Sequence, residues 1–173
     1  MTNNKFINPD IMKVAKNILA ENKDEFTCIR IGKDPRTLQK PTWITVKEAL
    51  EIYNKLECEI GISKTNVNYV DLDYAINRPI VDVVGTPKKS QFSRICECAY
   101  MISNYIPNRS AIQFSATIFL TLCKLNEFDM KFEVGEIYDI FIELYENQMT
   151  LEEFEQIMVK HLVSKVPQYI IPI

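Results

Sequence analysis

The stretch Asn108-Arg109-Ser110 places polar and basic side chains directly before a long apolar segment. A helix beginning here would present free backbone N–H groups and the positive end of its dipole, which together favour a bound anion. Arg109 and Ser110 could then hold a phosphate-like group, with Asn108 as the helix cap. The same residues also suit a structural role, in which Asn108 caps the helix and Arg109 covers its end.

Other residues with catalytic or metal-binding chemistry are sparse. His161 is the single histidine, and no Ser/Asp partner pattern surrounds it, so we expect a polar group near a helix C-terminus. The cysteines form no Cys-x-x-Cys pair, and on a helix Cys96 and Cys98 would point about 200° apart. We expect no zinc site and no disulfide framework, but reduced, mostly buried thiols at Cys28, Cys58, Cys96, Cys98 and Cys123.

Capping boxes and apolar periodicity predict the helices that position these residues. Thr45 and Glu48 form one box, which opens a helix on the 46–60 segment, and Thr150 and Glu153 form another, which opens a helix to about Val163. Apolar spacing predicts further helices over 70–77, 91–105, about 108–125 and 134–145. The 108–125 segment is apolar on nearly every side, which indicates a buried central helix. Trp43 and Tyr53 are expected in the core.

A composition break between Gly32 and Pro41 suggests how the chain is organised. We expect an N-terminal appendage over 1–40, with a helix over 9–21 and a candidate short strand over 26–31. A helical domain over 41–166 and an apolar tail over 167–173 would follow. The length of 173 residues, with 47% hydrophobic and 25% charged residues, suits one globular domain of this kind.

Charge and hydropathy limit the classes of partner. A net charge of -3 argues against the broad basic surface that nucleic acid requires, so nucleic acid is not expected. The longest apolar stretch, from Ile112 to Leu125, is interrupted by polar residues and falls short of a membrane span. No signal-peptide pattern opens the chain. We therefore expect a cytoplasmic protein with no membrane partner.

Four segments occur in order along the chain: ITVKEAL at 44–50, LDYAINRP at 72–79, LCKLN at 122–126, and the helix pair over 136–161. Together they resemble the death-on-curing (Doc) branch of the Fic family between Ile44 and about Leu162. The resemblance implies an all-α, Fic/Doc-like helical bundle around a buried central helix. It also implies a motif H-x-F-x-[D/N]-[A/G]-N-K-R, whose histidine is the general base, whose acid holds a metal ion, and whose following turn binds phosphate.

The motif itself is degenerate in this chain. Counting back from Leu125 places Tyr105 at the histidine, Arg109 at the metal-binding acid, Ile112 at the lysine and Gln113 at the closing arginine. A tyrosine is a poor base at neutral pH, and an arginine repels Mg²⁺. A register shifted by one residue retains the arginine but still finds no histidine upstream. We expect no activity by the family mechanism.

The resemblance also places Lys88, Lys89 and Arg94 where relatives have a flap that guides the target peptide, and a solvated loop is the alternative. The acidic side chains of the last two helices suit either a solvated face or a partner site.

Three functional hypotheses follow. The first is a catalytically degenerate Doc/Fic-like protein that binds or inhibits another protein without a cofactor, in a phage counter-defence or toxin–antitoxin setting. The alternative is a divergent kinase or nucleotidyl transferase that modifies a host protein and holds ATP with Mg²⁺ through Asn108, Arg109, Ser110, Lys88 and Lys89. The third is an antitoxin-like or inhibitory role for residues 1–40.

Overall fold

The computed structural model describes residues 29–30, 42–60, 67–106, 109–146 and 149–163. Helices hold about 70% of the interpretable residues, which confirms the expected, mostly helical fold. A 3-10 helix, η1 (Arg78–Ile80), follows the second of the described helices. These helices are α2 (Val46–Ile60), α3 (Tyr69–Asn77), α4 (Gln91–Tyr105), α5 (Ser110–Leu125), α6 (Glu136–Glu146) and α7 (Leu151–Lys160).

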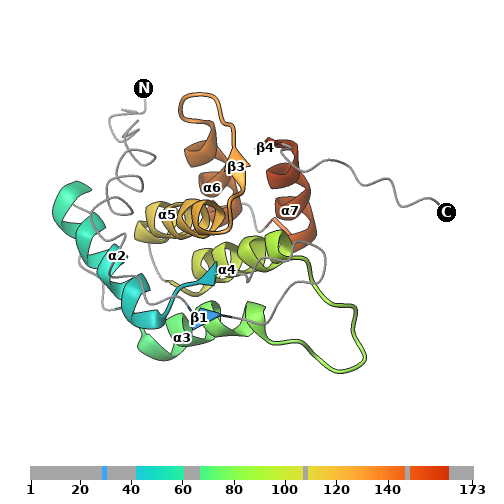
Figure 1. The fold of residues 1–173 in the computed structure, drawn as a ribbon. Helices are drawn as coiled ribbons and strands as arrows, with labels where there is room; N and C mark the ends of the chain where they lie inside the picture. Colours follow the sequence, from blue (N-terminus) through green and yellow to red (C-terminus); the bar gives the residue numbers. More distant parts are fainter. Residues whose placement is uncertain (1–28, 31–41, 61–66, 107–108, 147–148, 164–173) are drawn as a thin grey trace.

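Helix α5 lies at the centre of the bundle (Figure 1). It packs most extensively against α4, and it also contacts α6, α2 and the short strands β2 (Thr42–Trp43) and β3 (Asp129–Met130). From Ser110 to Cys123 every residue except Gln113 is buried. Neighbours on all sides thus cover a helix that is apolar on nearly every side, which confirms the expected buried central helix.

Both predicted capping boxes form. Thr45 Oγ1 accepts from the Glu48 backbone N–H at 3.2 Å, and Glu48 Oε2 accepts from the Thr45 N–H at 2.6 Å. Likewise, Thr150 Oγ1 accepts from the Glu153 backbone N–H at 3.2 Å, and Glu153 Oε2 accepts from the Thr150 N–H at 2.9 Å. Each box satisfies two otherwise free N–H groups, which fixes the starts of α2 and α7.

Aromatic side chains from α4, α5, α6 and α7 meet in the core. The ring of Phe119 on α5 lies 6.2 Å from Phe92, 6.0 Å from Phe141 and 6.2 Å from Phe154, measured between ring centroids. Phe119, Phe141 and Phe154 are fully buried. This cluster therefore holds α6 and α7 against the α4–α5 pair.

Trp43 joins strand β2 to helix α3. Its side chain is fully buried, and its indole Nε1–H donates to the backbone oxygen of Ile76 at 2.8 Å. Tyr53 is also buried and meets Phe114 edge to face at 5.1 Å between ring centroids. The expectation that Trp43 and Tyr53 belong to the core is confirmed.

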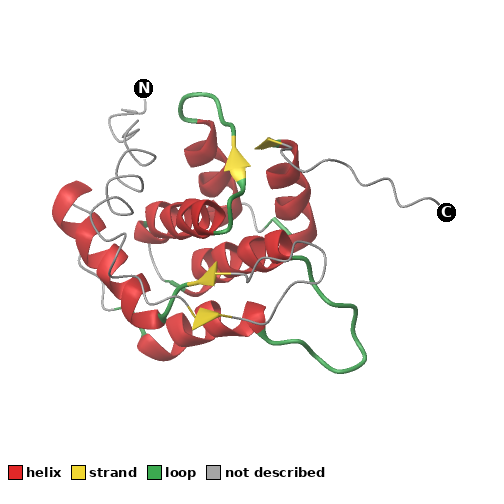
Figure 2. Cartoon of the chain, viewed as in Figure 1, coloured by secondary structure: helices red, strands yellow, loops and turns green. Residues whose placement is uncertain are grey.

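Two short antiparallel sheets accompany the helices (Figure 2). Strand β1 (Ile29–Arg30), within the candidate strand at 26–31, pairs with β2, and β3 pairs with β4 (Leu162–Val163). The expected extension of the last helix to Val163 is therefore wrong. The chain leaves the helix after Lys160 because β3 offers its backbone as a partner, which no local periodicity encodes.

Two helices also begin later than expected. Helix α6 starts at Glu136 rather than at Val134, since Gly135 has a φ of 85°, outside the helical region. Helix α5 starts at Ser110 rather than at about Asn108, which lies outside the described residues. Also outside them lie Cys28, the expected helix over 9–21 and the tail over 167–173.

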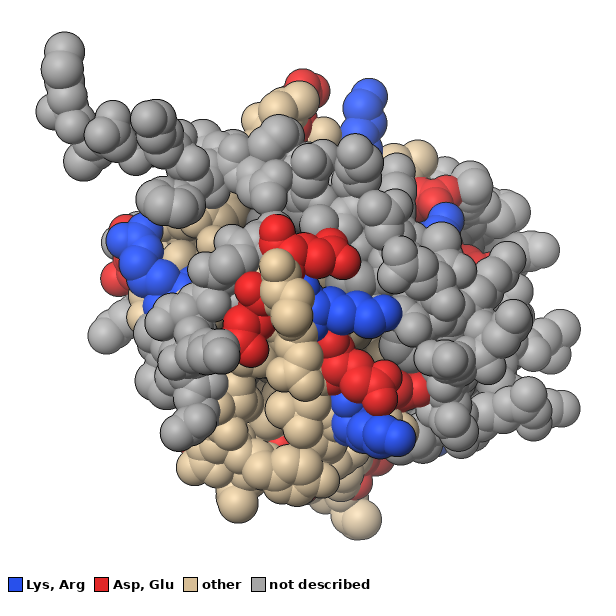
Figure 3. All heavy atoms as spheres, turned by 90° about the vertical axis from the view of Figure 1, so that its left-hand side faces the viewer, with Lys and Arg blue, Asp and Glu red and all other residues tan. Residues whose placement is uncertain are grey.

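The outer surface of α2 carries charges of both signs. Figure 3 shows basic and acidic side chains next to one another on this side of the molecule. On α2 itself these are lysines and glutamates, and Lys47 lies 4.0 Å from Glu51 one turn away. Among the described helices, none combines the length and the apolar character that crossing a membrane requires.

Candidate functional site

The positions aligned with the catalytic motif lie around the junction of α4 and α5. Tyr105 is the last residue of α4, Arg109 directly precedes α5, and Gln113 lies in the first turn of α5. The two helices pack against each other, and few residues connect them, so these side chains belong to one end of the pair. Each of the three side chains, however, contacts a different residue: Tyr74, Glu146 and Tyr138, respectively.

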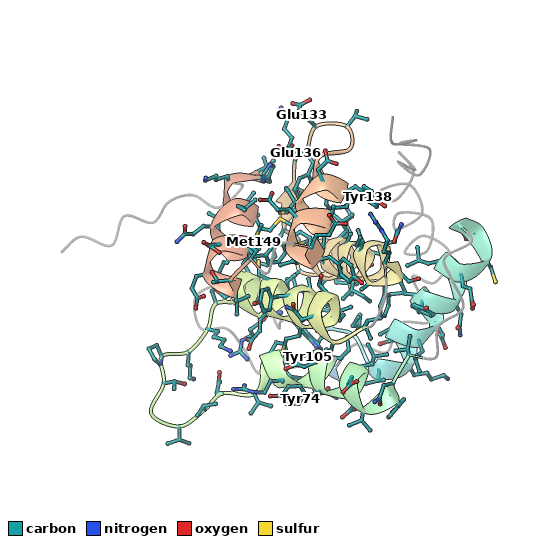
Figure 4. The ribbon with its side chains drawn as sticks, turned by 180° about the vertical axis from the view of Figure 1, so that it is seen from behind. Tyr74, Tyr105, Glu133, Glu136, Tyr138 and Met149 are labelled. Carbon is teal, nitrogen blue, oxygen red and sulfur yellow. The ribbon has the colours of Figure 1, made fainter. Side chains whose placement is uncertain are left out.

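Tyr105 packs against a second tyrosine at the protein surface. Its ring meets that of Tyr74 on α3 edge to face, with centroids 6.0 Å apart and planes 84° apart. Tyr105 is 45% exposed and Tyr74 is 48% exposed, and Figure 4 shows the two side chains beside each other. Among the described residues, no acidic or basic side chain hydrogen-bonds to the Tyr105 hydroxyl.

Arg109 faces a carboxylate rather than an open anion site. Its guanidinium Nη2 lies 3.4 Å from Glu146 Oε1 at the end of α6. Arg109 occupies the N-cap position of α5 but makes no side-chain cap hydrogen bond, while Ser110 beside it is buried. The exposed pair links the α5 start to α6, and an incoming phosphate would compete with Glu146 for the arginine.

Gln113 points toward α6. Its amide Nε2–H donates to the Tyr138 hydroxyl oxygen at 3.4 Å, and its Oε1 is buried without a hydrogen-bond partner in the described part of the chain. A buried amide oxygen without a donor lowers stability. The polar contact between α5 and α6 at Gln113 is therefore only partly satisfied. Gln113 is therefore not directed at the same place as Tyr105.

The lysines of the exposed loop over 81–90 do not converge with Arg109. Lys88 is exposed, whereas Lys89 Nζ lies 2.5 Å from Glu97 Oε2 on α4. Glu97 lies near the middle of α4, whereas Arg109 follows the C-terminal end of this helix and pairs with Glu146 on α6. The two cations thus face different carboxylates and do not converge on one anion site.

Arg94 does not belong to a solvated loop, as the sequence had suggested, because it lies on α4 and is only 8% exposed. Its guanidinium donates to Asp82 Oδ1 at 2.6 Å and to the Pro79 oxygen at 3.2 Å. A buried arginine requires such partners. The Arg94–Asp82 and Lys89–Glu97 ion pairs therefore fasten the two ends of the exposed loop to α4.

His161 forms a cluster that sequence reasoning missed. Its Nε2 lies 3.0 Å from Glu136 Oε1 on α6, its Nδ1 lies 2.9 Å from the Ile157 oxygen, and its ring stacks on Phe132 at 4.7 Å. The Glu133 backbone N–H and the His161 side chain, in that order of effect, hold the pKa of Glu136 below its ordinary value. No local pattern signals this pair, since Glu136 begins α6 and His161 directly follows α7, 25 residues later in the chain.

A surface of tyrosines is the second feature that the sequence analysis missed. On α3, Tyr69 is 59% exposed, and Val70, one turn before Tyr74, is 72% exposed. We call Tyr69, Val70, Tyr74 and Tyr105 the tyrosine surface. The available signal was that α3 carries apolar residues on its outward face as well as on its buried face of Leu72, Ala75 and Ile76.

The described thiols and acids form no metal site. Cys96, Cys98 and Cys123 are buried, and burial raises the pKa of each thiol far above its ordinary value, so they are inert. Cys58 is exposed. No group of three His, Cys, Asp or Glu side chains in the described ranges is arranged to hold a metal ion. The predicted burial is confirmed for Cys96, Cys98 and Cys123, whereas Cys58 is exposed.

Comparison with known proteins returned no match: no family model, no curated protein and no solved structure matches this chain. The class defined by the fold and the described site is a mostly helical protein with an exposed tyrosine surface.

Proposed function

We propose that this chain is a protein-binding module on a Doc-like helical scaffold that has lost the chemistry of the family. The observation that carries the proposal is the tyrosine surface. Tyr69, Val70, Tyr74 and Tyr105 expose between 45% and 72% of their surface and come from two packed helices. Contiguous exposed apolar side chains lose unfavourable contact with water when a partner covers them, and such patches are typical of protein interaction sites.

Tyrosine suits this role for physical reasons. Its rigid ring buries a large area at a low cost in conformational entropy, and its hydroxyl finds a hydrogen-bond partner in a wet interface. Tyrosines are among the residues that dominate binding energy when a neighbour holds them in place. The edge-to-face contact between Tyr74 and Tyr105 supplies such a neighbour.

The contacts of the basic residues argue against the nucleotide-binding alternative. Arg109 is paired with Glu146 and Lys89 with Glu97. A nucleotide that used both cations would have to displace a carboxylate from each of them, and the two carboxylates lie on different helices, α4 and α6. An inhibitory role in a counter-defence or toxin–antitoxin setting is part of the proposal, and the identity of the partner would test it.

The test compares partner capture by three versions of the full-length chain. The wild type should retain a specific protein from host extract, the Tyr74→Ala/Tyr105→Ala variant should lose it, and Val159→Ala, an exposed valine on α7, should keep it. Isothermal titration with ATP and GTP, with and without Mg²⁺, should give no heat. Metal-dependent binding that Arg109→Ala abolishes would favour the kinase or nucleotidyl transferase alternative.

A further inference from the structure

The outward face of α3 combines aromatic and acidic side chains. Tyr69 and Asp73 are one turn apart, as are Val70 and Tyr74, and all four are exposed. Residues four apart lie next to each other on a helix surface. The carboxylate of Asp73 therefore lies beside Tyr69, and that of Asp71, three residues before Tyr74, lies beside Tyr74.

The carboxylates of α3 have no basic partner among the described residues. Neither Asp71 nor Asp73 makes an ion pair with a described Lys or Arg, and the α3 sequence YVDLDYAIN contains no basic residue. Asp73 Oδ1 accepts a hydrogen bond from Asn77 Nδ2 at 3.0 Å. By contrast, Asp82, Glu97 and Glu146 each face a basic side chain. This surface thus carries negative charge that the described residues do not neutralise.

The charge of the chain is also unevenly distributed. Residues 42–173 contain 12 basic and 18 acidic residues, a net charge of -6, and residues 1–41 contain 8 and 5, a net charge of +3, which together give the -3 of the whole chain. An acidic body attracts basic partners from a distance and repels phosphate backbones. The net negative charge of residues 42–173 and the carboxylates of Asp71 and Asp73 therefore both favour a positively charged partner.

We infer that the tyrosine surface, with Asp71 and Asp73, binds an arginine- or lysine-rich segment of a partner protein. This inference rests on the proposed function and names the chemistry of the partner. A guanidinium can lie on a tyrosine ring face, where the ring quadrupole attracts it, while donating to an aspartate. Val70 offers an apolar contact for the stem of the basic side chain.

The test uses the full-length chain and three labelled peptides of equal length. Leucine alternates with arginine in the first peptide, with glutamine in the second and with glutamate in the third. By fluorescence anisotropy, only the arginine peptide should bind, and its affinity should fall as salt rises. Tyr74→Ala/Tyr105→Ala should weaken this binding by about tenfold or more.

Charge variants separate the tyrosine surface from general attraction to an acidic protein. Asp71→Asn/Asp73→Asn should weaken binding of the arginine peptide and flatten its salt dependence, whereas Asp139→Asn, an exposed residue of α6, should leave both unchanged. Circular dichroism and urea denaturation would verify that each variant folds. Equal effects of the two charge changes, or binding that survives loss of both tyrosines, would overturn the inference.

The outcomes also separate this inference from the proposed function. If the glutamine or glutamate peptide binds through Tyr74 and Tyr105 instead, the basic specificity is wrong and the protein-binding role stands. If no peptide binds and the tyrosine changes leave partner capture intact, both proposals fail.

Discussion

The side-chain amide of Asn126 is hydrogen-bonded to both backbone polar groups of Thr42, 84 residues earlier in the chain. Asn126 Oδ1 accepts from the Thr42 N–H at 2.9 Å, and Nδ2–H donates to the Thr42 oxygen at 2.8 Å. The same amide accepts from Gln91 Nε2 at 3.2 Å and donates to the Leu122 oxygen at 2.8 Å. One side chain thus joins strand β2, the start of α4 and the end of α5.

Asn126→Ala should lower the free energy of unfolding by about 2 kcal/mol or more, because several hydrogen bonds are lost together and the Thr42 groups lose their partner. Urea denaturation measures this change. Asn104→Ala is the matched control, since Asn104 is exposed and its described hydrogen bond runs to the Tyr100 oxygen of its own helix. Equal losses in the two variants would show that the amide does not join these elements.

Phe119→Ala should lower the free energy of unfolding by about 3–5 kcal/mol, because Phe119 is fully buried. Its ring contacts those of Phe92, Phe141 and Phe154. Phe119→Leu refills part of the volume, so its cost should be smaller. Both are measured by urea denaturation, with Val159→Ala, which alters an exposed side chain, as the near-neutral reference. A small loss for Phe119→Ala would mean that the aromatic cluster does not hold α6 and α7.

Glu136 should make the free energy of unfolding depend on pH in the acidic range. Its pKa lies below the ordinary value of 4.5 in the folded state, owing first to the Glu133 N–H and then to His161. A depressed carboxyl pKa contributes stability that is present above about pH 4.5 and is lost as the pH falls through the folded-state pKa. The difference in unfolding free energy between wild type and Glu136→Gln should therefore favour the wild type near neutrality and vanish in strong acid. Glu143→Gln, an exposed change on α6, is the control, and a difference that persists in acid would contradict the assignment.

Thiol labelling should distinguish Cys58 from the buried cysteines. In a Cys28→Ser background, the native chain should react with a thiol reagent at Cys58 alone, because burial raises the pKa of Cys96, Cys98 and Cys123 and blocks access to them. In concentrated urea all four should react. Mass spectrometry of labelled peptides locates the sites, and rapid native labelling of Cys98, for example, would refute the packing of α4 against α5.

Trypsin should cut the exposed loop over 81–90 after Lys88 or Lys89. The ion pairs that fasten this loop to α4 should set the rate of cleavage. Asp82→Asn leaves the buried Arg94 without its carboxylate, so the loop should open more often and cleavage should be several-fold faster. Asp139→Asn should not change the rate. Urea denaturation of the same variants separates local opening from global destabilisation, and an unchanged rate in Asp82→Asn would argue against the anchor.

Local signals predicted the helices well. Thr45 with Glu48, and Thr150 with Glu153, fix helix starts through hydrogen bonds that span three residues, so the pattern is complete within the sequence. The C-terminal end of α7 was placed too late in the sequence, because the backbone of Leu162 and Val163 pairs with β3, a distant segment. The start of α6 was missed because Gly135 adopts a positive φ that apolar periodicity does not reveal.

The sequence by itself determined the mostly helical fold and the buried position of α5, because helical hydrogen bonds are local and an apolar surface on every side requires neighbours on every side. Only the tertiary structure decided that Tyr105 meets Tyr74, that Arg109 faces Glu146, and that His161 faces Glu136. Each of these pairs joins residues of different elements, and such contacts depend on how helices dock. That docking is set by the fit of whole buried faces, which no short stretch of residues specifies.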